Sequence, residues 1–249
     1  MRVIVTRPRE EAERWVRDLR SRGFAAVALP LIDIGPPPDI HAIREAWRAL
    51  DRTRAAMFVS GNAVRGFFAN RAAGNPFDTR AWAPGPGTRD ALLAAGVDAS
   101  QIDSPPEDAG YDSEALWPRV RSQLRPGDRV LMVRGGNEQG EAAGREWLSQ
   151  QVETEGGVIH GLVSYVRRVP QWSPQERAQA QAPDAVWLFS SSEAVANLDR
   201  LLPGQDWSAA RACATHPRIR DAALRLGWRE VLVCAPTLAA VATSLESLG

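Results

Sequence analysis

The chain carries Phe-Val-Ser-Gly-Asn-Ala-Val at residues 58–64 and a related stretch, Phe-Ser-Ser-Ser-Glu-Ala-Val, at residues 189–195. The two stretches are 131 positions apart (189 − 58). The same offset relates a second set of identities, in which Ala83, Pro86, Asp90, Ala91, Leu93, Gly96 and Pro105 match Ala214, Pro217, Asp221, Ala222, Leu224, Gly227 and Pro236. One offset held over so many identities without a gap predicts a duplicated structural unit.

A weaker match extends the duplication toward the N-terminus. Residues 3–8 read Val-Ile-Val-Thr-Arg-Pro, and residues 130–135 read Val-Leu-Met-Val-Arg-Gly, at an offset of 127 (134 − 7). In both segments an apolar run reaches an arginine, Arg7 or Arg134, before a helical pattern. We therefore expect two similar halves.

Short apolar runs alternate with helical patterns along the whole chain. Ala12, Trp15, Val16 and Leu19 are spaced as one face of a helix. Uninterrupted apolar runs are typical of buried parallel strands. The expected strands are 2–6, 25–29, 55–60, 81–83, 128–133, 158–162, 185–190, 210–214 and 230–234. Strand–helix alternation predicts an α/β fold with two similar domains, each a parallel sheet flanked by helices.

Two segments are candidates for the joints between the domains. Residues 30–39 and 163–172 are short β-prone runs beside prolines, which stiffen connectors. Two crossings predict that one domain is inserted into the other.

Composition excludes several functions. The 249 residues include 30 basic and 30 acidic side chains, so the chain lacks the basic footprint of a nucleic-acid-binding protein. It contains no lysine, which excludes Schiff-base chemistry and a P-loop. Its histidines and two cysteines show no metal-ligand spacing, so we expect no metal site. No apolar stretch approaches the ~20 residues of a membrane span, and unpaired cysteines favour the cytoplasm.

In order and spacing, these segments resemble the uroporphyrinogen-III synthase family over nearly the whole chain. The opening residues 3–8 are similar to the start of that family. Residues 58–64 resemble its strand followed by a Ser-Pro-x-Ala-Val turn, and residues 130–135 its strand that ends in Arg-Gly. Residues 163–170, Val-Ser-Tyr-Val-Arg-Arg-Val-Pro, are similar to its Val-Tyr-Arg linker.

The resemblance implies a domain plan. Residues 1–33 plus 170–249 would form a discontinuous first domain, and residues 39–163 an inserted second one. Segments 30–39 and 163–172 would be two antiparallel linker strands. The active site would lie in the cleft between the domains.

The resemblance also implies a reaction. Hydroxymethylbilane would be cyclised to uroporphyrinogen III with loss of water and inversion of the last pyrrole ring through a spiro intermediate, without a cofactor. The substrate would be a linear tetrapyrrole polyanion, and hydroxymethylbilane synthase would be the partner that hands it over. We expect a monomer.

Small and polar residues at the ends of the expected strands are candidates to bind the substrate. Each such segment leads into a helix, whose free N–H groups and dipole attract carboxylates. The candidates are Ser60, Gly61, Asn62, Gly87, Thr88, Ser190, Ser191, Ser192 and His216. Helix capping is the competing interpretation for Ser60, Thr88 and Ser191.

Three further side chains stand out. Tyr165 is the candidate acid, because a phenol can donate a hydrogen bond to a departing hydroxyl and the family's linker tyrosine is assigned such a role. The competing interpretation is a tyrosine packed on the linker. Arg7 and Arg134 are candidates to pair with carboxylates bidentately, with an ion pair inside a domain as the alternative for each.

Two other functions stay open at this point. The family often has Gly-Pro-Thr-Thr where this chain has His216-Pro217-Arg218-Ile219, which favours a non-catalytic tetrapyrrole- or anion-binding module. A nucleotide-binding oxidoreductase needs a glycine fingerprint after the first strand, where this chain has Thr6-Arg7-Pro8-Arg9 instead.

Overall fold

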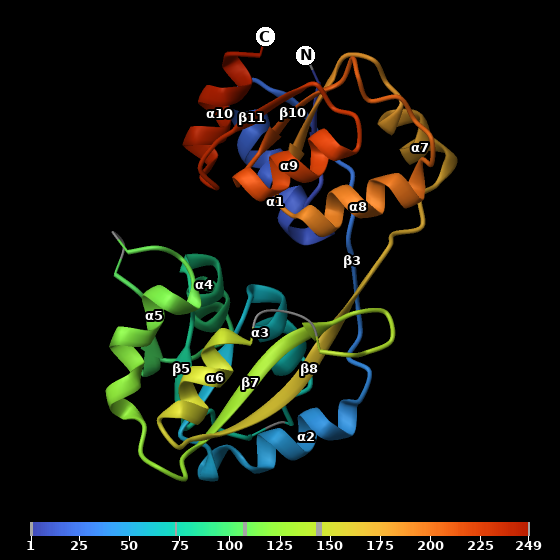
Figure 1. The fold of residues 1–249 in the computed structure, drawn as a ribbon. Helices are drawn as coiled ribbons and strands as arrows, with labels where there is room; N and C mark the ends of the chain where they lie inside the picture. Colours follow the sequence, from blue (N-terminus) through green and yellow to red (C-terminus); the bar gives the residue numbers. More distant parts are fainter. Residues whose placement is uncertain (1, 73, 107–108, 143–145, 249) are drawn as a thin grey trace. The chain divides into compact units, whose positions relative to one another are not determined.

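The computed structural model describes residues 2–72, 74–106, 109–142 and 146–248. The chain divides into two compact units: unit 1 contains Met1–Asp33 and Arg168–Gly249, and unit 2 contains Ile34–Arg167. Each unit holds a sheet of mostly parallel strands flanked by helices, which confirms the predicted fold class (Figure 1). The predicted domain limits and linker strands stay predictions.

The sheet of unit 1 has the order β11-β10-β9-β1-β2, and every neighbouring pair is parallel. Its strands are β1 (Arg2–Val5), β2 (Ala25–Ala28), β9 (Ala185–Phe189), β10 (Arg211–Ala214) and β11 (Glu230–Val233). Its helices are α1 (Arg9–Ser21), α7 (Pro174–Ala180), α8 (Ser192–Leu201), α9 (Pro217–Arg225) and α10 (Leu238–Glu246). Helices α1 and α10 share one core with alternate residues of the strands. The predicted apolar face of α1, which includes the fully buried Leu19, points into this core.

The sheet of unit 2 has the order β3-β8-β7-β4-β5-β6 and is parallel from β8 to β6. Its strands are β3 (Asp33–Gly35), β4 (Ala55–Phe58), β5 (Arg80–Trp82), β6 (Ile102–Asp103), β7 (Arg129–Gly136) and β8 (Val158–Arg168). Its helices are α2 (Ile40–Arg48), α3 (Gly61–Phe68), α4 (Pro86–Ala94), α5 (Ser113–Val120) and α6 (Trp147–Thr154), with short 3-10 turns η1 (Leu50–Arg52), η2 (Ala99–Gln101) and η3 (Arg121–Gln123).

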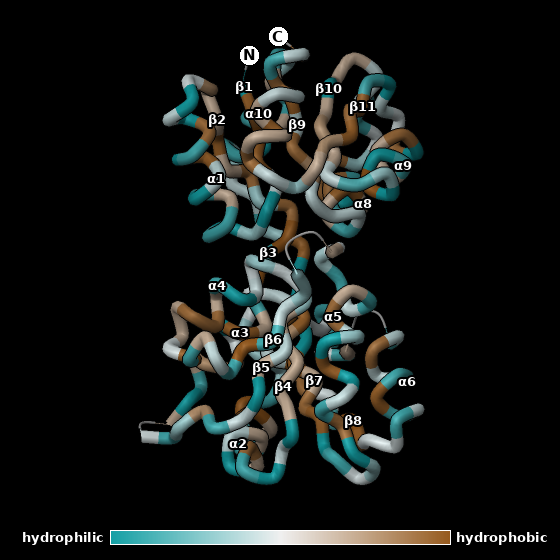
Figure 2. Tube along the Cα trace, turned by 90° about the vertical axis from the view of Figure 1, so that its left-hand side faces the viewer, coloured by the Kyte–Doolittle hydropathy of each residue, from teal (hydrophilic) through white to brown (hydrophobic). Residues whose placement is uncertain are grey.

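Unit 2 has one apolar core on each face of its sheet. Helices α2, α3 and α4 pack around Phe58 and Phe67, and α5 and α6 pack around Met57 and Trp82. Burying a large apolar side chain fully contributes roughly 1.5–3 kcal/mol, so these cores hold the helices on the sheet. Figure 2 shows the hydrophobic residues gathered in the strands, while much of the helical surface is hydrophilic.

The strand order agrees with the predicted duplication. From its far edge, unit 2 reads β6-β5-β4-β7-β8, and unit 1 reads β11-β10-β9-β1-β2 in the same sense. Helices α3 and α8 begin at residues 61 and 192, and α4 and α9 begin at residues 86 and 217. Both pairs keep the offset of 131 found in the sequence.

Two strands are longer than predicted. We expected ends at Val133 and Leu162, but β7 continues to Gly136 and β8 to Arg168. Gly135 and Gly136 belong to β7, and both pair with β8 after a register shift that follows Arg134. The strand β6 was missed, since a run of two residues shows no periodicity.

Candidate active site

The carboxyl ends of β4 and β5 in unit 2 each lead directly into a helix. Ser60 is the N-cap of α3, where its Oγ accepts a hydrogen bond from Ala63 N at 3.2 Å. Gly85 is the N-cap of α4 and provides no side-chain cap. A Cβ added to Gly61 would lie 3.3 Å from the carbonyl oxygen of Gly87, so the first turns of the two helices adjoin. The predicted loops therefore come together at the edge where parallel α/β sheets bind ligands.

Two predicted residues lie in these first turns with different surroundings. Asn62 is engaged locally, because its Oδ1 accepts from Arg65 Nη2 at 2.6 Å. Thr88 is buried and is not the cap of α4, which corrects the capping interpretation for this residue. The space around Gly87 is open, since a Cβ there would meet no atom within 4 Å.

Tyr165 lies at the same edge. Its side chain is buried, and its hydroxyl oxygen is 3.2 Å from Ser60 Oγ. Ser60 also accepts from the backbone of α3, so it ties the phenol to the start of that helix. The geometry places a phenolic O–H beside helix-terminal N–H groups, where it is able to act as an acid next to a bound anion.

Two glycines outside the set of candidate site residues, Gly66 and Gly135, fix the position of this tyrosine. A Cβ on Gly135 would lie 2.5 Å from the Cζ atom of Tyr165, and a Cβ on Gly66 would lie 2.2 Å from the carbonyl oxygen of Ser164. Ser164 Oγ donates to the carbonyl of Ala63 at 3.0 Å. Strand β8 therefore packs closely against α3 and β7 at Tyr165. In the sequence, the pair Gly135-Gly136 at the end of an apolar run was the pattern that could have indicated this close packing.

In unit 1 the predicted serines and histidine line one pocket of about 400 Å³, together with Thr215, Arg218, Ile219 and Pro236. Ser190, Ser191 and Ser192 follow β9, and His216 follows β10. Ser191 Oγ caps α8 by accepting from Glu193 N at 3.2 Å. His216 Nδ1 caps α9 by accepting from Arg218 N at 3.1 Å, which leaves its Nε2 to carry a hydrogen.

Arg218 is a candidate ligand residue that the sequence did not include among the binders. It lies in the first turn of α9, where the helix dipole disfavours a cation. It forms no ion pair with any residue that the structure describes, and none of the described residues that line the pocket is acidic. A bound carboxylate would offset both the dipole and the unpaired charge.

Arg7 and Arg134 occupy equivalent strand ends and each pairs inside its own unit. Arg7 Nη1 lies 3.4 Å from Glu11, its guanidinium carbon lies 4.4 Å from the ring centroid of Trp15, and burial lowers the pKa of the guanidinium. Arg134 is buried and hydrogen-bonds to Glu146, and that bond is the main cause of the lowered pKa of the Glu146 carboxyl. This geometry favours the ion-pair interpretation, and a substrate contact by either arginine stays a prediction.

A family model described as uroporphyrinogen-III synthase HemD matches residues 13–242. The chain belongs to the uroporphyrinogen-III synthase family. Members of this family are lyases of tetrapyrrole biosynthesis that cyclise hydroxymethylbilane.

Two relatives named uroporphyrinogen-III synthase illustrate the similarity. The protein of Synechococcus elongatus is 28% identical over 83% of this chain and 78% of its own length. The protein of Escherichia coli is 26% identical over 94% of both chains.

Solved structures of the family share the fold. The synthase of Helicobacter pylori aligns over all of both chains with a TM-score of 0.62 at 16% identity. A mutant synthase of Thermus thermophilus covers all of this chain and 97% of its own, with a TM-score of 0.58 at 18% identity. Family membership removes the nucleotide-binding oxidoreductase, and β1 accordingly leads into α1 through Pro8 without a glycine turn.

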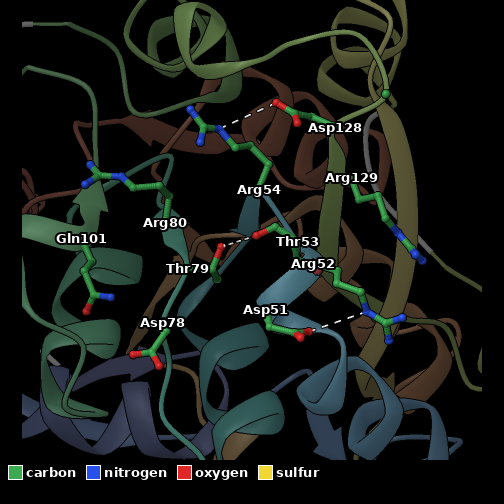
Figure 3. Close-up of a pocket in the computed structure, with 11 residues that line it drawn as sticks. Asp51, Arg52, Thr53, Arg54, Asp78, Thr79, Arg80, Gln101, Asp128 and Arg129 are labelled. Carbon is green, nitrogen blue, oxygen red and sulfur yellow. Dashed lines mark hydrogen bonds and ion pairs between the residues drawn. The ribbon is translucent and has the colours of Figure 1, made fainter.

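A pocket of about 530 Å³ lies at the opposite edge of the unit 2 sheet, where its strands begin (Figure 3). Its arginines are engaged with neighbouring groups. Arg54 donates to the carbonyl of Gln123 and lies 3.7 Å from Asp128, while Arg80 forms two hydrogen bonds to Asp103. These contacts connect Arg54 to η3 and Arg80 to β6, so both arginines take part in a structural Arg–Asp network.

Within the described residues, no group of three or more His, Cys, Asp or Glu side chains is arranged to hold a metal ion. None of the helices in the described part of the chain is long and apolar enough to span a membrane.

Proposed function

We propose that this chain converts hydroxymethylbilane into uroporphyrinogen III with Tyr165 as the acid that starts the reaction. The observation that supports this role is the 3.2 Å contact between the Tyr165 hydroxyl and Ser60, at the edge where α3 and α4 begin. There the phenol stands beside backbone N–H groups able to bind the carboxylates of the same substrate.

The proposed first step transfers the Tyr165 proton to the hydroxyl of the substrate, which leaves as water. The resulting azafulvene is attacked by the substituted carbon of the last pyrrole, and the spiro intermediate then fragments and recloses with that ring inverted. The last pyrrole releases a proton when its aromaticity returns, and this proton restores the phenol. The protein favours this closure over the uninverted one by binding its transition state better.

Each unit has groups that are suited to bind carboxylates. In unit 1 these are the hydroxyls of Ser190–Ser192, the Nε2–H of His216 and the guanidinium of Arg218, and in unit 2 they are the first turns at Gly61 and Gly87. Preorganised donors of this kind stabilise negative charge without reorganising during the reaction. Arg7 and Arg134 hold α1 and α6 in place.

We also propose that the enzyme is a cytoplasmic monomer that receives its substrate from hydroxymethylbilane synthase. The two free thiols support a reducing compartment. Burial raises the pKa of Cys213 to about 12, which keeps that thiol protonated and unreactive.

Isomer analysis tests the proposed activity. Hydroxymethylbilane is generated in place by its own synthase, with and without this protein, and the products are oxidised and resolved into type I and type III uroporphyrins. We expect a type III product that depends on the protein. Type I alone from well-folded protein would contradict the proposal and favour a binding module.

A further inference from the structure

A second pocket of about 420 Å³ lies in unit 2, on the side of α4 away from α3. It lies between the start of α4, the carboxyl end of β6 and helix α5. The residues that line it include Gly85, Arg89, Ser104, Tyr111 and Arg119. Arg89, Ser104, Tyr111 and Arg119 were not among the candidate site residues. The pocket adjoins the first turn of α4, which contains Gly87, because Gly85 and Pro86 line it.

The pocket carries positive charge that no described residue neutralises. Arg89 on α4 and Arg119 on α5 are both exposed, and neither forms an ion pair with a described residue. No acidic side chain is among the described residues that line it. The nearby Asp112 is committed to capping α5, where its Oδ1 accepts from Ala115 N at 2.8 Å. Two guanidinium groups from different helices at one pocket are suited to bind a carboxylate.

Ser104 adds an independent polar signal. Its Oγ is buried and has no hydrogen-bond partner among the described residues. Buried hydroxyls are normally paired, so an unpaired one in a polar pocket points to a group that is bound there during function.

Tyr111 adds an aromatic surface. It is 54% exposed and is the one aromatic side chain among the exposed large hydrophobic residues of the described chain. A Cβ on Gly85 would lie 3.3 Å from the Tyr111 Cβ, so the absence of a side chain at residue 85 lets the tyrosine sit close to the start of α4. The residue of unit 1 that corresponds to Gly85, at the offset of 131, is His216.

We propose that this pocket is an additional subsite for one carboxylate-bearing pyrrole of the tetrapyrrole. Arg89 and Arg119 bind its carboxylates, Ser104 donates a hydrogen bond, and Tyr111 packs against the pyrrole ring. The inference rests on the proposed function, because it takes the same polyanion as its ligand. Arg119 also lies in the last turn of α5, where a cation offsets the helix dipole, so its role in binding must be separated from its role in stability.

Arginine modification on the unaltered full-length chain gives the first test. The protein is treated with phenylglyoxal with and without uroporphyrin III, the oxidised and stable form of the product, and adducts are located by peptide mass spectrometry. We expect uroporphyrin III to protect Arg89 and Arg119, while the exposed Arg44 and Arg121, which line no described pocket, stay reactive. Equal modification of all four with the porphyrin bound would overturn the proposal, as would a chain that does not bind the porphyrin.

A charge-matched pair of variants gives the second test. Arg89→Gln/Arg119→Gln should bind uroporphyrin III about 10- to 100-fold more weakly, with KM rising more than kcat falls, whereas Arg44→Gln/Arg121→Gln should match the wild type. Wild-type affinity in the first double variant would overturn the subsite. A wild type that forms type I product alone would contradict the proposed catalysis, while the protection experiment would still decide whether the pocket binds the porphyrin.

Discussion

Helix α3 of unit 2 and helix α8 of unit 1 each contact a backbone carbonyl of a neighbouring segment, but in two different ways. In unit 2, Gly66 of α3 lies against the carbonyl of Ser164, so closely that a Cβ would be 2.2 Å from the oxygen. In unit 1 the residue 131 positions later is Asn197 of α8, and its Nδ2 donates to the carbonyl of Leu31 at 2.8 Å. At this position the backbone of the helix contacts the carbonyl directly in unit 2, whereas in unit 1 the side chain of Asn197 bridges the helix to the carbonyl.

The difference shows why the candidate acid belongs to unit 2. The residue after Ser164 is Tyr165, whose hydroxyl contacts Ser60, and the residue after Leu31 is the apolar and buried Ile32. The close contact of α3 with β8 fixes the strand that carries Tyr165. Unit 1 has no tyrosine at the corresponding position, and serines, His216 and Arg218 line its pocket instead.

The largest effect is expected from Gly66→Ala. The new methyl group meets a backbone oxygen that cannot rotate away, so the free energy of unfolding should fall by about 3 kcal/mol or more. Gly161→Ala on β8 is the matched control, because a Cβ there meets no atom within 4 Å, and it should change stability by less than about 0.5 kcal/mol. Urea unfolding measures both, and equal midpoints for the two variants would contradict the close-contact account.

Tyr165→Phe should lower turnover by roughly one to a few orders of magnitude, since the variant keeps the ring and loses the proton donor. Its thermal stability should stay near the wild type. Type III formation from hydroxymethylbilane is the measurement, and unchanged turnover would remove the acid role. Ser60→Ala should have a smaller effect, because the backbone N–H groups remain, and complete loss of activity in a folded Ser60→Ala chain would argue against binding by backbone groups.

Asn197→Ala should reduce stability by about 1–3 kcal/mol, because the buried carbonyl of Leu31 loses its donor. Turnover should change little in protein that remains folded, since unit 1 holds no acid at this contact. Thermal unfolding measures the expected loss of stability, and type III formation measures the expected retention of turnover. A large loss of turnover without a loss of stability would contradict the purely structural role of this contact in unit 1.

Arg218→Gln should raise KM several-fold at low salt. The difference should shrink as salt increases, because an exposed charge is screened within a Debye length of about 10 Å at 0.1 M ionic strength. Arg220→Gln is the control on the same helix, since Arg220 pairs with Asp221 and does not line the pocket. Equal KM values for the two variants at every salt concentration would exclude Arg218 as a ligand residue.

The smallest effect is expected from Glu146→Gln on acid stability. Arg134 lowers the pKa of Glu146, so the ionised carboxylate stabilises the fold above the ordinary pKa of about 4.3. This contribution is lost as the pH falls through the lowered pKa of the folded chain. Stability of the wild type should therefore fall more steeply below about pH 4 than that of the variant. Parallel acid-unfolding curves would show that the ion pair of Arg134 with the exposed Glu146 contributes nothing measurable.

Several features of the candidate site were predictable because they depend on local rules. Ser60 and Ser191 cap helices, as their residue types favour. Tyr165 was singled out by resemblance, and the structure places it against Ser60. Arg218 was noted as a departure from the family, but its lack of an ion partner depends on neighbours far away in the sequence.

The sequence by itself determined the duplication, the α/β class and the loops that follow the strands. These are properties of periodicity, of turn chemistry and of one constant offset, and a linear chain displays them directly. The tertiary structure alone decided that Gly66 and Gly135 position Tyr165, and that Arg89 and Arg119 share a pocket. The physical reason is that close packing and charge pairing depend on distances between residues remote in the chain, which no local pattern encodes.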